Sequence, residues 1–189
     1  MTPDKVELTA MPTPNPNTVK FLLNQKLFES GSLEFSSAEE AADVILAEQL
    51  FNISEVEGVM VGFNFISVTK SDQAQWDQLL EPVRDSIIHT LETEDEPIPQ
   101  SRIDTSSQHS EQSDEISTRI KEILDNEIRP AIAMDGGDIV FRSFKDGIVS
   151  LFLMGACSNC PSSTMTLKMG IENRLKSEFP EIKEVVQEA

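Results

Sequence analysis

Two cysteines, Cys157 and Cys160, are the residues of this 189-residue chain whose type and spacing could support chemistry. No other cysteine is present. Thiols separated by two residues can both face one metal ion, and the thiolate is the form that binds metal or attacks a disulfide. A disulfide framework would instead join distant segments, so a structural staple of that kind is excluded. The pair therefore predicts metal binding or thiol redox chemistry.

The residues around the pair predict a loop between a strand and a helix. Ser158 and Asn159 allow a tight turn, and Pro161 sets the backbone for a first helical turn. Unpaired amides at a helix N-terminus favour the thiolate over the thiol. Gly155 and Ala156 carry no large side chain that would block approach from outside. We therefore expect an exposed, ionisable dithiol.

The number of thiols limits what one chain can hold. A [4Fe–4S] cluster or a tetrahedral zinc ion takes four thiolates, and one chain supplies two. His89 and His109 are poor candidates for the missing ligands, because one lies in a predicted helix of another domain and the other in a predicted linker. The simplest completion is a dimer in which each chain contributes Cys157 and Cys160 across a two-fold axis. Such a site opens when its interface loosens, as a carrier requires.

Two other interpretations of the pair remain open from spacing alone. A thioredoxin-like redox pair has the same C-x-x-C spacing, and so does half of a structural zinc site. The redox interpretation is weakened because a hairpin, and not a βαβ unit, is predicted to precede the pair. Nearby Met154, Met165 and Met169 are expected to be flexible core residues and not soft metal ligands.

The last third of the chain must position the pair. Isoleucines and a leucine from Ile116 to Ile132 recur at steps of three and four, which predicts an amphipathic helix. Asp146-Gly147 between two apolar runs predicts a hairpin. The expected elements are a helix over 114–133, strands over 138–144 and 148–154, a helix from Ser162 or Ser163 to Phe179, and a short strand over 182–187. The C-terminal domain is thus helix, hairpin, CxxC loop and helix.

The remainder of the chain predicts a second small domain and a linker. The segment 92–115 is rich in acid, Ser, Gln and Pro and too poor in apolar residues to form a core, so we expect a flexible acidic linker. Before it, strand, helix, hairpin and helix patterns follow one another. These are strands over 6–8 and 18–23, a helix over 36–50 with a cap at Ser36-Ser37, a hairpin over 58–69, and a helix over 76–91 kinked or restarted at Pro82. The predicted fold class is two small α+β domains, 1–91 and 116–189, joined by this linker.

Composition excludes several partners. A formal net charge of −18 argues against sequence-independent nucleic-acid binding, which needs Lys and Arg to displace counterions from phosphates. No apolar run approaches the roughly 18 residues that a membrane-spanning helix requires. The start, Met1-Thr2-Pro3-Asp4, resembles neither a signal peptide nor a transit peptide. We therefore expect a cytoplasmic protein with no nucleic-acid or membrane partner.

The chain resembles a known family over both predicted domains. The stretches RPAIAMDGGDIVF, KDGIVSLFLMGACSNCPSSTMTLKMGIENRL and FPEIKEVV are similar to the C-terminal domain of NifU, as found in Nfu-type iron–sulfur scaffold and carrier proteins. The segments MPTPNPNTVKF and EGVMVGFNFISVTKSDQAQWDQLLEPV are similar to the Nfu N-terminal domain. The acidic linker belongs to neither pattern.

The resemblance implies a function without catalysis. It implies a homodimer that holds one bridging [4Fe–4S] cluster through Cys157 and Cys160 of each chain. The cluster would come from upstream assembly machinery and pass to apo iron–sulfur proteins, while the N-terminal domain would serve client recognition or modulation. The alternatives that the residues leave open are a thiol–disulfide oxidoreductase using the same pair and a zinc-bridged interaction module.

Overall fold

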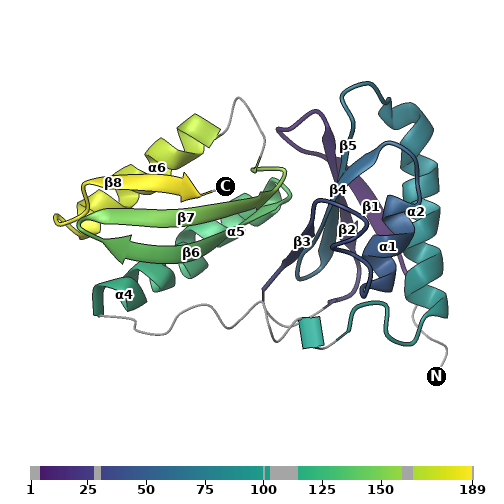
Figure 1. Cartoon of the computed structure of the whole chain (residues 1–189), viewed down its shortest axis with the longest axis horizontal. Helices are drawn as coiled ribbons and strands as arrows, with labels where there is room; N and C mark the ends of the chain where they lie inside the picture. Colours follow the sequence, from purple (N-terminus) through teal and green to yellow (C-terminus); the bar gives the residue numbers. More distant parts are fainter. Residues whose placement is uncertain (1–4, 28–30, 100, 103–114, 159–163, 189) are drawn as a thin grey trace.

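The structure is a computed structural model that describes residues 5–27, 31–99, 101–102, 115–158 and 164–188. It is α+β, as predicted, with two separate sheets, each covered by helices (Figure 1). Among the described residues, none of the helices has the length and hydropathy that crossing a bilayer demands.

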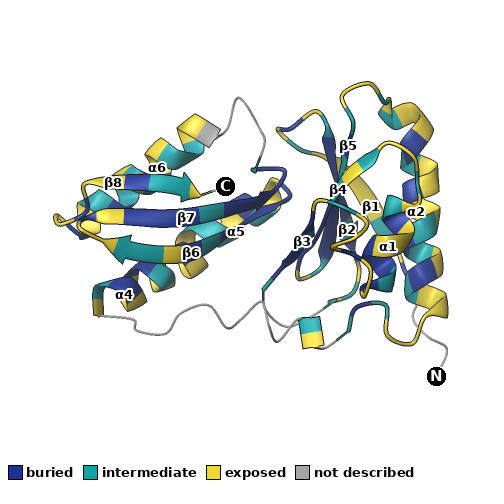
Figure 2. Cartoon of the chain, in the orientation of Figure 1, coloured by how far each residue is buried: buried dark blue, intermediate teal, exposed yellow. Residues whose placement is uncertain are grey.

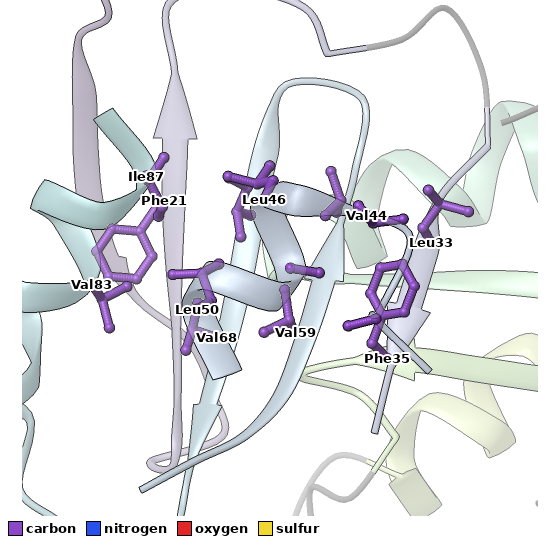
Figure 3. Close-up of a cluster of buried hydrophobic side chains, with 14 of the residues drawn as sticks. Phe21, Leu33, Phe35, Val44, Leu46, Leu50, Val59, Val68, Val83 and Ile87 are labelled. Atoms are coloured by element: carbon purple, nitrogen blue, oxygen red, sulfur yellow. The ribbon is translucent and has the colours of Figure 1, made fainter. Parts of the chain in front are cut away.

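The N-terminal sheet has five antiparallel strands in the order β1-β2-β5-β4-β3. Its strands are β1 Leu8–Pro12, β2 Thr18–Leu23, β3 Leu33–Phe35, β4 Val56–Val61 and β5 Phe65–Lys70. Helices α1 (Ile45–Phe51) and α2 (Trp76–Thr93) lie on one face. Between sheet and helices is the first apolar core, in which Phe21 packs with Leu50 and Val83 (Figure 3). Burying such side chains is the main stabilising contribution to this half of the molecule.

The C-terminal sheet has three strands in the order β6-β7-β8, of which β7 and β8 are parallel. Its elements are α4 Glu115–Ile123, a π-helical segment Leu124–Ile128, α5 Arg129–Met134, β6 Gly137–Lys145, β7 Ile148–Gly155, α6 Thr164–Glu178 and β8 Glu184–Glu188. A second apolar core, which includes the fully buried Ile120 and Leu175, holds the helices against the sheet (Figure 2). The hairpin and both flanking helical regions confirm the predicted order of elements.

The C-terminal elements depart from prediction mainly at the first helix. The expected single helix over 114–133 is interrupted by the π segment and restarts at Arg129. Pro130 supplies the physical reason, because its ring nitrogen cannot donate the bond that would continue the α-helical ladder. Residue 114 and residues 162–163, where the last helix was expected to begin, lie outside the described part of the chain.

The N-terminal elements depart from prediction at four places. The strand expected over 6–8 instead runs over Leu8–Pro12, because a proline is tolerated at the end of an edge strand. The helix expected over 36–50 is shorter: residues up to 44 form turns, and Ser37 Oγ accepts a bond from the Glu40 amide outside any helix. Strand β3 was not predicted, because three residues are too few to show alternation. Helix α2 continues through Pro82 to Thr93 without a break.

The first part of the predicted linker packs on the N-terminal domain. Ile98 is buried in the first core, and Pro97 O accepts a hydrogen bond from the Leu46 amide. Arg102 lies 3.1 Å from the Asp43 carboxylate. Residues 103–114 lie outside the described residues, so the linker bounds and the domain division at 91 and 116 stay predictions.

Candidate functional site

Cys157 lies directly after β7, against the core of the C-terminal domain. Its side chain is only 4% exposed and belongs to the same apolar cluster as Ile132 and Ile171. The expectation of an exposed thiol is therefore wrong for Cys157 in this conformation. Cys160, Pro161 and the residues to 163 lie outside the described residues, so the pair's mutual geometry stays a prediction.

Glycines explain why the thiol can be so closely covered. A Cβ added at Gly137 would lie 2.7 Å from Cys157 Sγ, closer than side chains ever approach, so only glycine leaves room for the sulfur. The backbone of the cysteine loop is tied to the same turn, because the Ala156 amide donates to Gly136 O at 3.1 Å. On the loop's other side, Ser158 Oγ donates to Gly155 O at 2.8 Å. The turn Asp135-Gly136-Gly137, which follows α5, thus contacts both the Cys157 sulfur and the Ala156 amide.

An apolar cavity of about 520 Å³ adjoins Cys157 between α5 and α6. Its lining includes Ile132 from α5, Leu167 and Ile171 from α6, and Pro14 from the N-terminal domain. A cavity of this size and polarity is typical of a place where another molecule inserts apolar groups.

Two methionines of α6, the helix that lines one side of this cavity, correct an expectation. Met165 and Met169 are 70% and 58% exposed, although both were expected to be core residues; Met154 is buried as expected. The two exposed side chains stand four residues apart on α6, so they share one face of the helix. Flexible, exposed methionines are favoured at surfaces that bind other proteins.

The N-terminal domain contacts the cysteine loop and the Gly136 turn through its sheet. Lys20 Nζ donates to Ala133 O and Ser67 Oγ donates to Gly136 O, each at 2.6 Å. The Gly155 amide donates to Glu34 Oε1 at 2.7 Å. The segments next to Cys157, predicted to lie in an independent domain, are therefore in contact with the other domain.

Two further contacts extend this interface to either side. Asn15 Nδ2 donates to Ala156 O at 3.4 Å, directly beside Cys157. Ser32 Oγ donates to the carboxylate of the buried Asp138. The same carboxylate forms an ion pair with Arg129 Nε at 2.9 Å, although the two groups are not aligned for a hydrogen bond. Gly155 and Ala156, expected to keep the loop open, instead admit the N-terminal domain.

Burial at this interface shifts the pKa values of Glu34 and Lys20. Burial raises the pKa of Glu34 to about 7, an effect that nearby Glu40 increases and the hydrogen bond from Gly155 partly opposes. Burial also lowers the pKa of Lys20, while Asp135 acts in the opposite direction. The Lys20 ammonium is nevertheless well placed, because it caps a carbonyl at the C-terminal end of α5 and lies 4.7 Å from the centre of the Phe65 ring.

Glu34 gives a pH-dependent prediction. Because its folded pKa lies above that of the unfolded chain, its stabilising contribution is complete below about pH 4.5 and is lost as the pH rises through about 7. Glu34→Gln keeps an acceptor for the Gly155 amide without a charge, so at pH 8 we expect up to about 3 kcal/mol greater stability than wild type, falling to near zero at pH 4. Urea unfolding at both pH values measures this. Glu48→Gln, at an exposed position on α1, should show no comparable difference.

No described group of three or more His, Cys, Asp or Glu side chains could hold a metal ion within one chain. His89 lies on α2 in the N-terminal domain, apart from the cysteine loop, and His109 lies outside the described residues. Neither histidine gains support as a ligand.

Two compact α+β units, one carrying a cysteine loop between a hairpin and a helix, define the class of this protein. The family model of the NifU-like domain matches residues 120–186, and that of the scaffold protein Nfu/NifU N terminal matches residues 8–94. The chain belongs to the Nfu family of NifU-like proteins.

Curated relatives match almost the whole chain. The human protein named NFU1 iron-sulfur cluster scaffold homolog, mitochondrial, is 40% identical over 93% of this chain and 69% of its own length. The protein of the same name from Drosophila persimilis is 38% identical and the NifU-like protein 4, mitochondrial, from Arabidopsis thaliana is 39% identical, each over 93% of this chain. The chain spans 62% and 64% of the length of these last two relatives.

Proposed function

We propose that this chain is an iron–sulfur cluster scaffold and carrier in which two copies share one [4Fe–4S] cluster through Cys157 and Cys160. The observation that carries the proposal is a family whose named members are iron–sulfur cluster scaffolds, together with a C-x-x-C pair after a hairpin in the matching NifU-like domain. One chain supplies two thiolates and a four-iron cluster takes four, so two chains complete the set.

The donor set of the chain fits such a cargo. Thiolate sulfur is the ligand that iron–sulfur clusters use in proteins, and the amides near a helix start favour the thiolate. The apolar cavity beside Cys157 and the exposed methionines of α6 give the second copy or a client a surface on which to pack. Because Cys157 is buried in this conformation, the loop must move before its sulfur can be shared.

Cluster transfer would then proceed by ligand exchange and not by catalysis. A client thiol loses its proton and forms an iron–sulfur bond, while the bond to Cys157 or Cys160 breaks and that sulfur takes up a proton. No electron is gained or lost, so the step needs no oxidant or reductant. The proposed partners are therefore a second copy of this chain, an upstream source of clusters and apo iron–sulfur proteins, and no enzymatic activity is required.

Anaerobic reconstitution with iron and sulfide tests this proposal. We expect a brown protein with about four iron and four sulfide ions per two chains, and a mass near twice 21.0 kDa in solution. Iron and sulfide analysis and native mass spectrometry measure both. A colourless monomer would contradict the carrier; zinc alone would indicate an interaction module, and catalytic reduction of a model disulfide would indicate an oxidoreductase.

Location is a separate part of the proposal. The cytoplasmic location expected from the sequence stays a prediction, whereas the three relatives are named as mitochondrial proteins. Cell fractionation with an antibody against the chain distinguishes the two compartments.

A further inference from the structure

We propose that the open face of the N-terminal sheet is an internal docking surface for the cysteine loop, and that the loop must leave this surface before a second copy can share its cluster. The inference rests on the proposed function for its second half only. Its first half, the docking itself, stands on contacts within one chain.

One row of residues across the sheet forms the docking surface. Strand register places Lys20 opposite Ser67, Ser67 opposite Met60, and Met60 opposite Glu34. Residues directly opposite one another in antiparallel strands point to the same face. Their neighbours along the strands, including Val19 and Phe21, belong to the core under α1 and α2, so the row points away from the helices. We call Lys20, Ser67, Met60 and Glu34 the docking row.

Three residues of the docking row are buried against the C-terminal domain, and Glu34 is half-buried. Lys20, Ser67 and Met60 are 7%, 1% and 1% exposed, although α1 and α2 lie on the opposite face of the sheet. Three of the four residues hydrogen-bond to the backbone around the Gly136 turn and Gly155. The fourth, Met60, packs with Met154 and Phe65 in a third small apolar cluster between the domains.

The C-terminal side of the interface is shaped to match. Gly136 and Gly155 have φ of +79° and +64°, and an added Cβ would lie 2.9 Å from Ser67 Oγ or 2.4 Å from Met60 Sδ. Glycine therefore serves both the left-handed backbone and the close approach of the docking row. The partner of this surface is thus a specific segment, the neighbouring turns at Gly136 and Gly155.

Docking and cluster sharing compete for the same loop. A second copy must bring its own ligands to a cluster bound at Cys157, which is 4% exposed here. Glu34 and Asn15 hold Gly155 and Ala156, the two residues before it, and Pro14 forms part of the wall of the adjoining cavity. Undocking removes all three from the loop at once. The N-terminal domain is therefore a gate that lowers the fraction of chains competent to dimerise around a cluster.

Ser67→Lys in the full-length chain tests both halves. The long cation cannot fit between strand β5 and Gly136, so the two domains should separate. The radius of gyration of the apo chain, measured by small-angle scattering, should then rise by at least about 2 Å above the roughly 16 Å of a compact chain of this length. Anaerobic cluster loading under limiting iron and sulfide should become up to about tenfold faster, because a larger fraction of chains is competent. Ser54→Lys adds the same charge at an exposed turn and should change neither quantity.

Glu34→Lys provides a second opening variant on the short edge strand β3, with Glu48→Lys on α1 as its control; circular dichroism verifies that each variant folds. An unchanged radius of gyration in both opening variants would overturn the docking. A larger radius with unchanged or slower loading would overturn the gate. If the radius responds as expected while wild type and all variants stay colourless, docking is supported and the proposed function is what fails.

Discussion

Replacing Cys157 or Cys160 by alanine is expected to abolish cluster binding. Each variant leaves two thiolates in a dimer where a four-iron cluster takes four, and no described His, Cys, Asp or Glu group can replace them. After anaerobic reconstitution, both variants should show no cluster absorbance and less than about a tenth of the wild-type iron and sulfide. They should also lack the cluster-dependent dimer in native mass spectrometry.

The control must separate a lost ligand from a lost fold. Ser158→Ala alters the same loop and removes the hydrogen bond from Ser158 Oγ to Gly155 O, but keeps both thiols, so it should retain the cluster. Cys157→Ala removes only a small buried group, and its free energy of unfolding should fall by about 1 kcal/mol or less. A variant that still binds four irons would show that another residue is a ligand. The proposal that two chains supply two thiolates each would then be wrong.

Patterns local in the sequence predicted the hairpin and the helix that position the site. Asp146 and Gly147 adopt φ of +54° and +85°, the backbone that this dipeptide tolerates best, and the β6–β7 hairpin follows from it. Leu167, Ile171 and Leu175 recur every four residues and lie on α6 as expected. Such patterns are reliable because each depends on residues close in sequence.

Long-range packing determined what the sequence missed. Lys20 and Ser67 alternate with apolar neighbours, a pattern that ordinarily marks a strand with one face in water, yet both are buried against residues more than 60 positions away. The exposed state expected for Cys157 failed because its sulfur packs in the apolar core of its own domain and against the Gly137 turn, while Asn15 of the other domain bonds to the neighbouring Ala156 carbonyl. A glycine pair after a helix indicates a helix end equally well whether or not another domain docks on it.

Leu175→Ala is expected to destabilise the C-terminal domain by about 2–5 kcal/mol, the range for removing a fully buried leucine. Leu175 is 0% exposed in the second core, where it holds α6 against the three-stranded sheet. Leu167→Ala on the same helix is the matched control. Leu167 is only partly buried beside the cavity, so its replacement should cost clearly less.

The two domains can be monitored separately in this experiment, because the single tryptophan, Trp76, lies on α2 of the N-terminal domain. Among the described residues, the small cluster around Met60 and Met154 and a few hydrogen bonds lie between the two large cores. Leu175→Ala should therefore lower the urea midpoint of the circular dichroism change assigned to the C-terminal domain, while the midpoint from Trp76 fluorescence shifts much less. Equal shifts of both signals would mean that the docked chain unfolds as one cooperative unit. The N-terminal domain could then not leave the cysteine loop without unfolding of the C-terminal domain.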